Sequence, residues 1–194
     1  MSVAQPDGVE PDLDHGEQHS DPADVMAESR SDPEVVARIV CLRALEQRAR
    51  TRAELATLLR KRGVPDEAAT TVLDRFTEVG LVDDEALAVE FSRAAHLDRN
   101  LSRRAVATKL RQRGVDATTI DTAVAPIDPS SERAAARRLA ERKVRTLGTA
   151  DPEARLRRIV GLLARRGYSS GVAYSVAREV VGGAMADLPD PGDD

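Results

Sequence analysis

Side chains that commonly catalyse reactions or bind metals are few in this chain and stand far apart. Its 194 residues include one cysteine, Cys41, and three histidines, His15, His19 and His96. No Cys/His spacing matches a zinc site, and no glycine-rich loop follows a strand to hold phosphate. The acidic run at 83–85 could supply an acid, a base or a metal ligand, but negative charge there also suits the start of a helix. We therefore predict a protein that is not an enzyme and has no metal site or cofactor.

Basic residues, by contrast, recur at regular intervals. They gather in the segments 48–62, 99–113 and 155–166, where acidic residues are few or absent. Such groups can bind the phosphates or carboxylates of a partner, and the alternative for each of them is an ordinary solvated surface. The predicted contact set is Arg60, Lys61, Arg62, Arg103, Arg104, Lys109, Arg111, Arg113, Arg165 and Arg166.

The overall charge of −4 conceals this basic character. Residues 1–32 hold nine Asp and Glu against one Arg, and residues 183–194 hold four Asp and no basic residue. When these contributions of −8 and −4 are set aside, residues 33–182 carry +8. A basic body of this kind favours an anionic partner. The two ends have the composition of disordered acidic tails.

The region between the tails has the composition and the start signals of a helical protein. Aromatic residues are only 2% of the chain, and signals such as Asp32-Pro33, Thr51 with Glu54, and Asp128-Pro129 recur along it. No secretory signal or membrane-spanning stretch is recognisable, so we expect a cytoplasmic protein. The predicted helices lie at about 33–48, 52–62, 66–79, 84–98, 102–113, 117–126, 130–146, 152–166 and 170–181.

One short phrase occurs three times, as LLRKRGV, KLRQRGV and LLARRGY. Its glycines, Gly63, Gly114 and Gly167, are 51 and 53 residues apart, and apolar residues at equal offsets share one helical face in each copy. Each glycine is best explained as a left-handed residue that ends a helix. We therefore predict an all-α fold of three tandem three-helix repeats in an elongated body, with one compact bundle as the alternative. The predicted boundaries are 1–32 for the acidic tail, 33–82, 83–128 and 129–182 for the repeats, and 183–194 for the second tail.

A helix, a glycine turn and a second helix also describe the helix-turn-helix of DNA-reading proteins. After the first two turns, residues 66–79 hold four acidic residues against one arginine, and residues 116–128 hold three Asp and no basic residue. We therefore do not expect these helices to read base edges. Four aromatic residues are too few for a platform on which single-stranded bases stack. Non-specific DNA binding through phosphate contacts stays open as the alternative to a protein filament, and a helical scaffold for an unrelated partner is a third hypothesis.

Four segments, through their order and spacing, make the chain similar to a known family. They are TRAELATLLRKRGV (51–64), EVGLVDDEALAVEF (78–91), SRRAVATKLRQRGVD (102–116) and LARRGYSSGVAYSVARE (163–179). Over residues 35–181 the chain resembles the bacterial RecX family, regulators of the RecA recombinase. The resemblance implies tandem three-helix units that bind the RecA–DNA filament in its helical groove and lower its recombinase, ATPase and co-protease activities.

The resemblance also sets the expected partners. These are RecA protein and its nucleoprotein filament, with weak direct contact to DNA in addition, and the protein is expected to be a monomer without enzymatic activity. The chain departs from the family pattern at Asn100-Leu101, where a glycine is expected shortly before Ser102, and in its long acidic leader.

Overall fold

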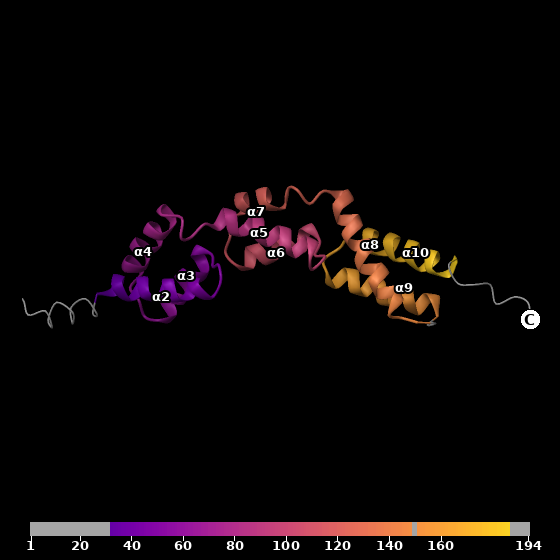
Figure 1. Cartoon of the computed structure of the whole chain (residues 1–194), viewed down its shortest axis with the longest axis horizontal. Coiled ribbons are helices and arrows are strands. Elements are labelled where there is room, and N and C mark those ends of the chain that lie inside the picture. The colour runs from indigo at the N-terminus through magenta and orange to yellow at the C-terminus, as the bar shows by residue number, and fades with distance from the viewer. Residues whose placement is uncertain (1–31, 149–150, 187–194) are drawn as a thin grey trace, which may run out of the picture.

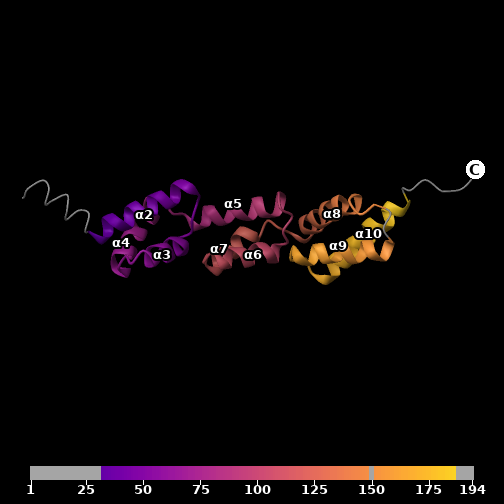
Figure 2. The ribbon, with the colours of Figure 1, turned by 90° about the horizontal axis from the view of Figure 1, so that it is seen from below.

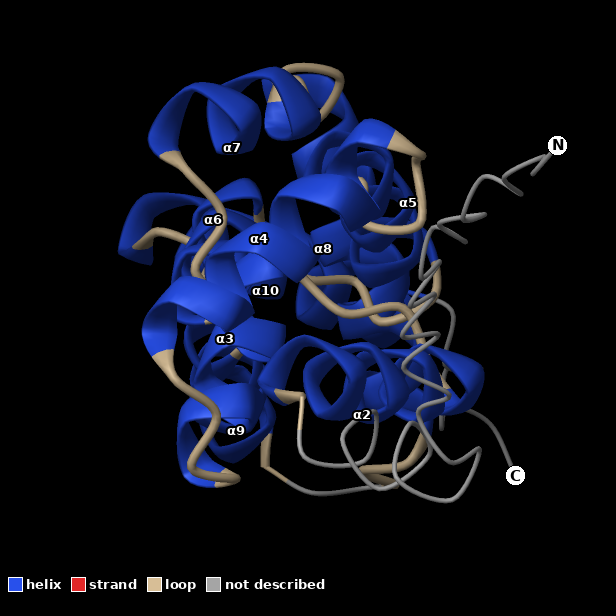
Figure 3. Cartoon of the chain, turned by 90° about the vertical axis from the view of Figure 1, so that its left-hand side faces the viewer, coloured by secondary structure: helices blue, strands red, loops and turns tan. Residues whose placement is uncertain are grey.

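The computed structural model describes residues 32–148 and 151–186, and these residues form helices and no strand (Figures 1 and 3). The all-α prediction is confirmed, while most of the two predicted acidic tails lies outside the described residues. The helices are α2 (Pro33–Gln47), α3 (Arg52–Lys61), α4 (Asp66–Glu78), α5 (Asp84–Leu97), α6 (Arg103–Gln112), α7 (Ala117–Val124), α8 (Pro129–Arg145), α9 (Pro152–Arg165) and α10 (Ser170–Ala186).

The helices form three groups that follow one another along the long axis of the molecule (Figure 1). We call α2–α4 the first module, α5–α7 the second and α8–α10 the third. The helix pairs that pack extensively against each other all belong to the same module. The body is therefore elongated, as predicted, and the alternative of one compact bundle is wrong.

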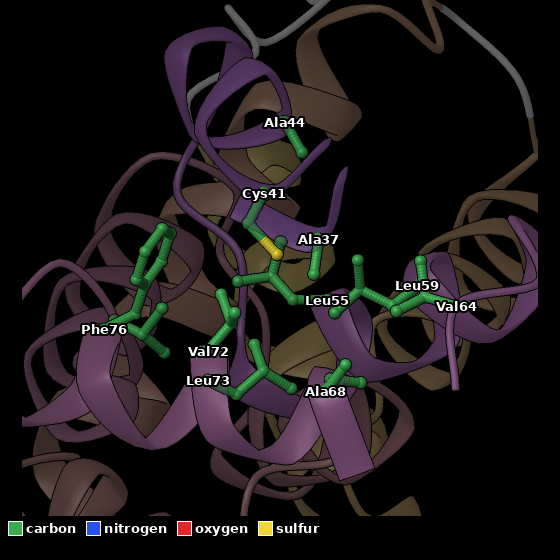
Figure 4. Close-up of a cluster of buried hydrophobic side chains, with 12 residues drawn as sticks. Ala37, Cys41, Ala44, Leu55, Leu59, Val64, Ala68, Val72, Leu73 and Phe76 are labelled. Atoms are coloured by element: carbon green, nitrogen blue, oxygen red, sulfur yellow. The ribbon is translucent and has the colours of Figure 1, made fainter. Parts of the chain in front are cut away.

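Each module has its own hydrophobic core. In the first, Leu55 and Leu59 of α3 lie between α2 and α4, where Cys41, Val72 and Phe76 are also buried (Figure 4). The residues at the same offsets from the other two glycines, Val106 and Leu110 of α6 and Ile159 and Leu163 of α9, lie in separate clusters in the second and third modules. Since each module excludes water from its own apolar residues, the array needs no common core.

The helix starts follow the predicted caps. Thr51 and Glu54 form a complete capping box at α3, and the carboxylates of Asp32, Asp128 and Asp151 accept hydrogen bonds from first-turn amides of helices that begin with proline. Most helix ends lie within one or two residues of their predicted positions. The exception is α10, which continues through two glycines to Ala186 instead of ending near 181.

The repeated glycines end the second helix of each module, as predicted. Gly63, Gly114 and Gly167 have φ angles of 75°, 80° and 90°, in the left-handed region. Where a glycine was expected before α6, Asn100 adopts this region, with φ of 49°. Asparagine is among the few residues that tolerate this backbone conformation.

The first junction between modules joins the end of α6 to the start of α3. Thr51 Oγ1 donates to the carbonyl of Arg113 at 2.6 Å, and the guanidinium of Arg113 makes two hydrogen bonds of 3.0 Å to the Glu54 carboxylate. Gly114 lies so close that a Cβ there would be 2.3 Å from Ala53 Cβ. The first junction therefore consists of polar contacts around Gly114 and Ala53, where the end of α6 lies close to the start of α3.

The second junction repeats this arrangement between the end of α9 and the start of α6. The Ser102 amide donates to the carbonyl of Arg166 at 3.1 Å, and a Cβ on Gly167 would be 2.6 Å from Ala105 Cβ. Tyr168 donates its hydroxyl to the Asn100 carbonyl at 3.0 Å. Burial raises the pKa of Tyr168 to about 12, so its hydroxyl keeps this proton at neutral pH.

The Asn100 side chain also spans the second junction. In the amide orientation that satisfies both groups, its nitrogen donates to Ala135 O at 3.2 Å and its oxygen accepts from Arg142 at 2.8 Å. Both partners belong to α8. Asn100 thus combines a left-handed backbone with side-chain bonds to the next module, which a glycine could not make.

We predict that Gly114→Ala destabilises the protein more than Gly63→Ala. Both changes force alanine into a left-handed backbone, at a cost of about 1 kcal/mol. At Gly114 the new Cβ also collides with Ala53, whereas at Gly63 no atom lies within 4 Å. We expect about 2 kcal/mol more destabilisation at Gly114, measured by urea unfolding with circular dichroism. Equal losses at the two positions would contradict the close approach at the first junction.

We predict that the Glu54 carboxylate makes the free energy of unfolding depend on pH. Burial alone would raise its pKa, but hydrogen bonds from Arg113, Arg48 and the Thr51 amide lower it from its usual 4.5 to about 2. The stabilisation is therefore fully present above pH 4.5 and is lost as the pH falls towards 2. With allowance for its partial exposure, Glu54→Gln should lower the free energy of unfolding at neutral pH by about 2 kcal/mol.

The matched control for Glu54→Gln is Glu78→Gln. Glu78 forms a largely exposed pair with Arg75, so its loss should change stability by less than about 0.5 kcal/mol. Urea unfolding measured from neutral pH down to pH 2 compares the two variants. An unchanged acid dependence in Glu54→Gln would show that this carboxylate does not hold the first junction.

Candidate functional site

The acidic run that could have held a metal serves the fold. Asp83 caps α5 by accepting the Ala86 amide at 2.8 Å, and Asp84 accepts the Arg52 amide at 2.9 Å across the first junction. This confirms the interpretation of the run as a helix start. Across residues 32–148 and 151–186, no three His, Cys, Asp or Glu residues are grouped so that they could hold a metal ion. None of the helices in these ranges is long and apolar enough to cross a membrane.

The predicted basic residues lie at the ends of the second helices of the three modules. These helices, α3, α6 and α9, follow one another along one edge of the body (Figure 2). Basic residues occupy the last turns of all three, and α6 has two more in its first turn. The ten residues are thus spread over three successive modules, with the largest share on α6.

Eight of the ten predicted side chains are exposed and form no ion pair within the described part of the chain. They are Arg60, Lys61, Arg62, Arg103, Arg104, Lys109, Arg111 and Arg165. Their charges face solvent and can meet an anionic partner without first leaving an internal carboxylate.

Two of the ten predicted residues have structural contacts at the junctions. Arg113 pairs with Glu54, leaving its side chain 19% exposed, and its guanidinium lies 5.6 Å from the centre of the Phe91 ring. Arg166 donates to the carbonyl of Arg99. Both side chains hold modules together, so they are less free to bind a partner than the other eight.

Many arginines outside the predicted set are neutralised locally. Arg75 and Arg93 pair with acids three residues away on their own helices, and Arg52 pairs with Asp74. Sequence composition counts these residues like any other arginine. The structure therefore separates arginines with internal partners from the exposed residues at the ends of α3, α6 and α9.

A shallow cleft of about 430 Å³ lies along α3 beside the first junction. Lys61, Arg111 and Arg113 of the predicted set line it, together with Arg50, which was not in that set. Arg50 precedes the helix cap and donates to the Ala44 carbonyl at 3.1 Å. Its position next to Thr51 in a basic segment was the only signal in the sequence, and it did not reveal which way the side chain turns.

The α6 helix begins with an unusual charge arrangement. Arg103 and Arg104 stand in its first turn, which contains no acidic residue. The carboxylate of Glu132, from α8, accepts the Arg103 amide at 3.0 Å. The two guanidinium groups are exposed beside a second cleft of about 400 Å³ at the second junction.

The sequence matches three family models in chain order. They are described as the first, second and third three-helix domains of RecX, and they match residues 37–76, 83–124 and 131–176. Each matched segment lies within one of the three helical modules. The three family models therefore divide the chain into the same three parts as the three hydrophobic cores.

Several curated proteins are similar in sequence to this chain over most of their length. The regulatory protein RecX of Thermobifida fusca (strain YX) is 47% identical over 157 residues, covering 80% of this chain and 85% of that protein. The regulatory protein RecX of Streptomyces coelicolor is 43% identical, covering 96% of this chain and 99% of the relative. That of Mycolicibacterium smegmatis is 48% identical, covering 81% and 88%.

Two solved structures share the fold. A crystal structure of regulatory protein RecX superposes with a TM-score of 0.65 at 23% identity, covering 82% of this chain and 78% of that one. RecX from Lactobacillus salivarius superposes with a TM-score of 0.66 at 17% identity, covering 77% and 97%. With the three matched domain models and the relatives above 40% identity, these findings show that the chain belongs to the RecX family of regulatory proteins.

Proposed function

We propose that this protein regulates the RecA recombinase by binding the RecA–DNA filament, most simply as an inhibitor of its recombination, ATPase and co-protease activities. It would act in the cytoplasm as a monomer without catalysis of its own, in homologous recombination, DNA repair and the SOS response. Membership of the RecX family supports the regulatory role. The link to RecA comes from the resemblance of its sequence motifs to that family.

One structural observation supports filament binding most directly. Exposed basic residues recur at the ends of α3, α6 and α9 in an elongated row of three modules. A partner that presents anionic groups at a regular repeat can meet several of these clusters at once. Linked weak contacts then add up to strong binding, because each contact after the first is intramolecular.

The proposed mechanism is bridging of successive filament subunits by successive modules. The junction contacts at Glu54 and Asn100 fix how neighbouring modules sit, so binding by one module positions the next. A chain held across several subunits would oppose the conformational changes that accompany ATP hydrolysis, or block the access of a second DNA strand.

The first test titrates the full chain into the cognate RecA during single-stranded-DNA-dependent ATP hydrolysis. We expect inhibition at fewer than one molecule per RecA subunit, under salt conditions in which binding to bare DNA is negligible. Direct phosphate binding weakens steeply with added salt and needs no RecA, which distinguishes the alternative of a non-specific DNA-binding protein. Unchanged hydrolysis together with tight binding to bare DNA would favour that alternative.

The second prediction concerns the basic residues of α6. The double variant Arg104→Glu with Lys109→Glu should need at least about tenfold more protein for the same inhibition of hydrolysis, since two exposed cations become anions. The matched control, Arg75→Glu with Arg93→Glu, makes the same change in charge at residues that pair within their own helices. Equal loss in both variants would mean that net charge, and not the α6 surface, governs binding.

A further inference from the structure

The two junctions share one pattern, in which the end of a second helix meets the start of another. The carbonyl of the residue before the helix-ending glycine accepts a hydrogen bond from the cap residue of the preceding module. Thr51 donates through its hydroxyl to the carbonyl of Arg113, and Ser102 donates through its backbone amide to the carbonyl of Arg166. Each glycine packs against an alanine in the first turn of the helix it meets, Ala53 or Ala105. A helix end and a capped helix start are therefore complementary halves of one contact.

The first module carries a third copy of the helix end, and this copy is unoccupied within the described residues. Arg62 and Gly63, at the end of α3, correspond to Arg113 and Gly114 and are exposed. A Cβ on Gly63 would meet no atom within 4 Å. Neither the carbonyl nor the guanidinium of Arg62 has a hydrogen-bonding partner among residues 32–148 and 151–186. The glycine-ended helix end, which meets a partner at both internal junctions, thus has no partner in the first module among the described residues.

The third module, at the opposite end of the array, lacks a second helix that starts with a Ser or Thr cap. Thr51 and Ser102 stand twelve residues before their glycines, and the residue twelve before Gly167 is Arg155. Because α9 begins about one turn earlier, at Pro152, Arg155 lies inside the helix and is buried, donating to the carbonyl of Gly148. The start of α9, capped by the carboxylate of Asp151, therefore lacks the Ser or Thr cap that meets the end of a second helix at both junctions.

We propose that the exposed end of α3, residues 60–63, is a docking surface for the N-terminus of a helix in a partner protein. The partner helix has Ser or Thr at its cap, a small residue in its first turn, and Glu three residues after the cap. Its hydroxyl donates to the Arg62 carbonyl, the small residue leaves room for Gly63, and its carboxylate pairs with the Arg62 guanidinium. These are the roles of Thr51, Ala53 and Glu54 at the first junction.

Charge and dipole support the same occupant. Arg60, Lys61 and Arg62 place three cations at this end, where a Glu in the partner helix finds an opposite charge. The negative end of the α3 dipole meets the positive start of the partner helix, as in both internal junctions. This inference goes beyond the proposed function and holds whether or not the chain binds RecA.

The test uses the isotope-labelled full chain, without RecA or DNA, and a synthetic alanine-rich helical peptide that begins Thr-Ala-Ala-Glu. We expect saturable shifts of the backbone amide resonances of residues 62–64 in nuclear magnetic resonance spectra. A matched peptide that begins Ala-Ala-Ala-Gln lacks the hydroxyl and the carboxylate and should bind about tenfold more weakly. This comparison leaves the protein unaltered, so it does not depend on the folding of a variant.

Two protein variants complete the test. Arg62→Ala should weaken binding of the first peptide about tenfold, whereas Arg43→Ala, which removes an exposed arginine of α2, should not change it. Absence of shifts at residues 62–64, or equal affinity for both peptides, would overturn the proposal. So would shifts spread evenly over the basic residues of α6, which indicate general charge attraction. Self-association that Arg62→Ala abolishes would make a second copy the occupant instead.

Discussion

The shape of this molecule depends on the contact between a glycine-ended helix and the capped start of the helix before it in the array. Both internal junctions are of this kind, and they place α3, α6 and α9 head to tail along one edge (Figure 2). The carbonyl end of one helix, with its partial negative charge, meets the amide end of the next. Glycine at Gly114 and Gly167 is required twice over, for the left-handed turn and for the close approach of the backbones.

The junctions described above are held by hydrogen bonds and by the Glu54–Arg113 ion pair, and this separates two kinds of stability. Each module keeps its own core, so loss of a junction need not unfold the modules beside it. The alignment of modules depends instead on hydrogen bonds and on the Glu54–Arg113 pair. The spacing and orientation of the basic clusters are therefore set by a few polar groups, while their presence depends only on the modules.

Local patterns made much of the fold predictable, whereas contacts between distant residues were not. The capping box at Thr51 joins residues three apart, and the equal offsets around the three glycines are enough to indicate the repeats. The pair between Glu54 and Arg113 joins residues 59 positions apart, and nothing in composition separates Arg113 from the exposed Arg111. The expected glycine before α6 was replaced by Asn100, because that position needs both a left-handed backbone and a side chain that bonds to α8.

The first turn of α6 shows most clearly where fold and surface make different demands. A cation near a helix N-terminus opposes the helix dipole and costs roughly 0.3–1 kcal/mol. The corresponding turns of α3 and α9 contain Glu54 and Glu153, whereas α6 has Arg103 and Arg104 and no acid of its own. Ser102 at the cap and Glu132 from the next module offset this cost through the backbone amides, leaving both guanidinium groups exposed. Natural proteins break such local rules at functional sites, and here two exposed guanidinium groups stand where the helix dipole disfavours them.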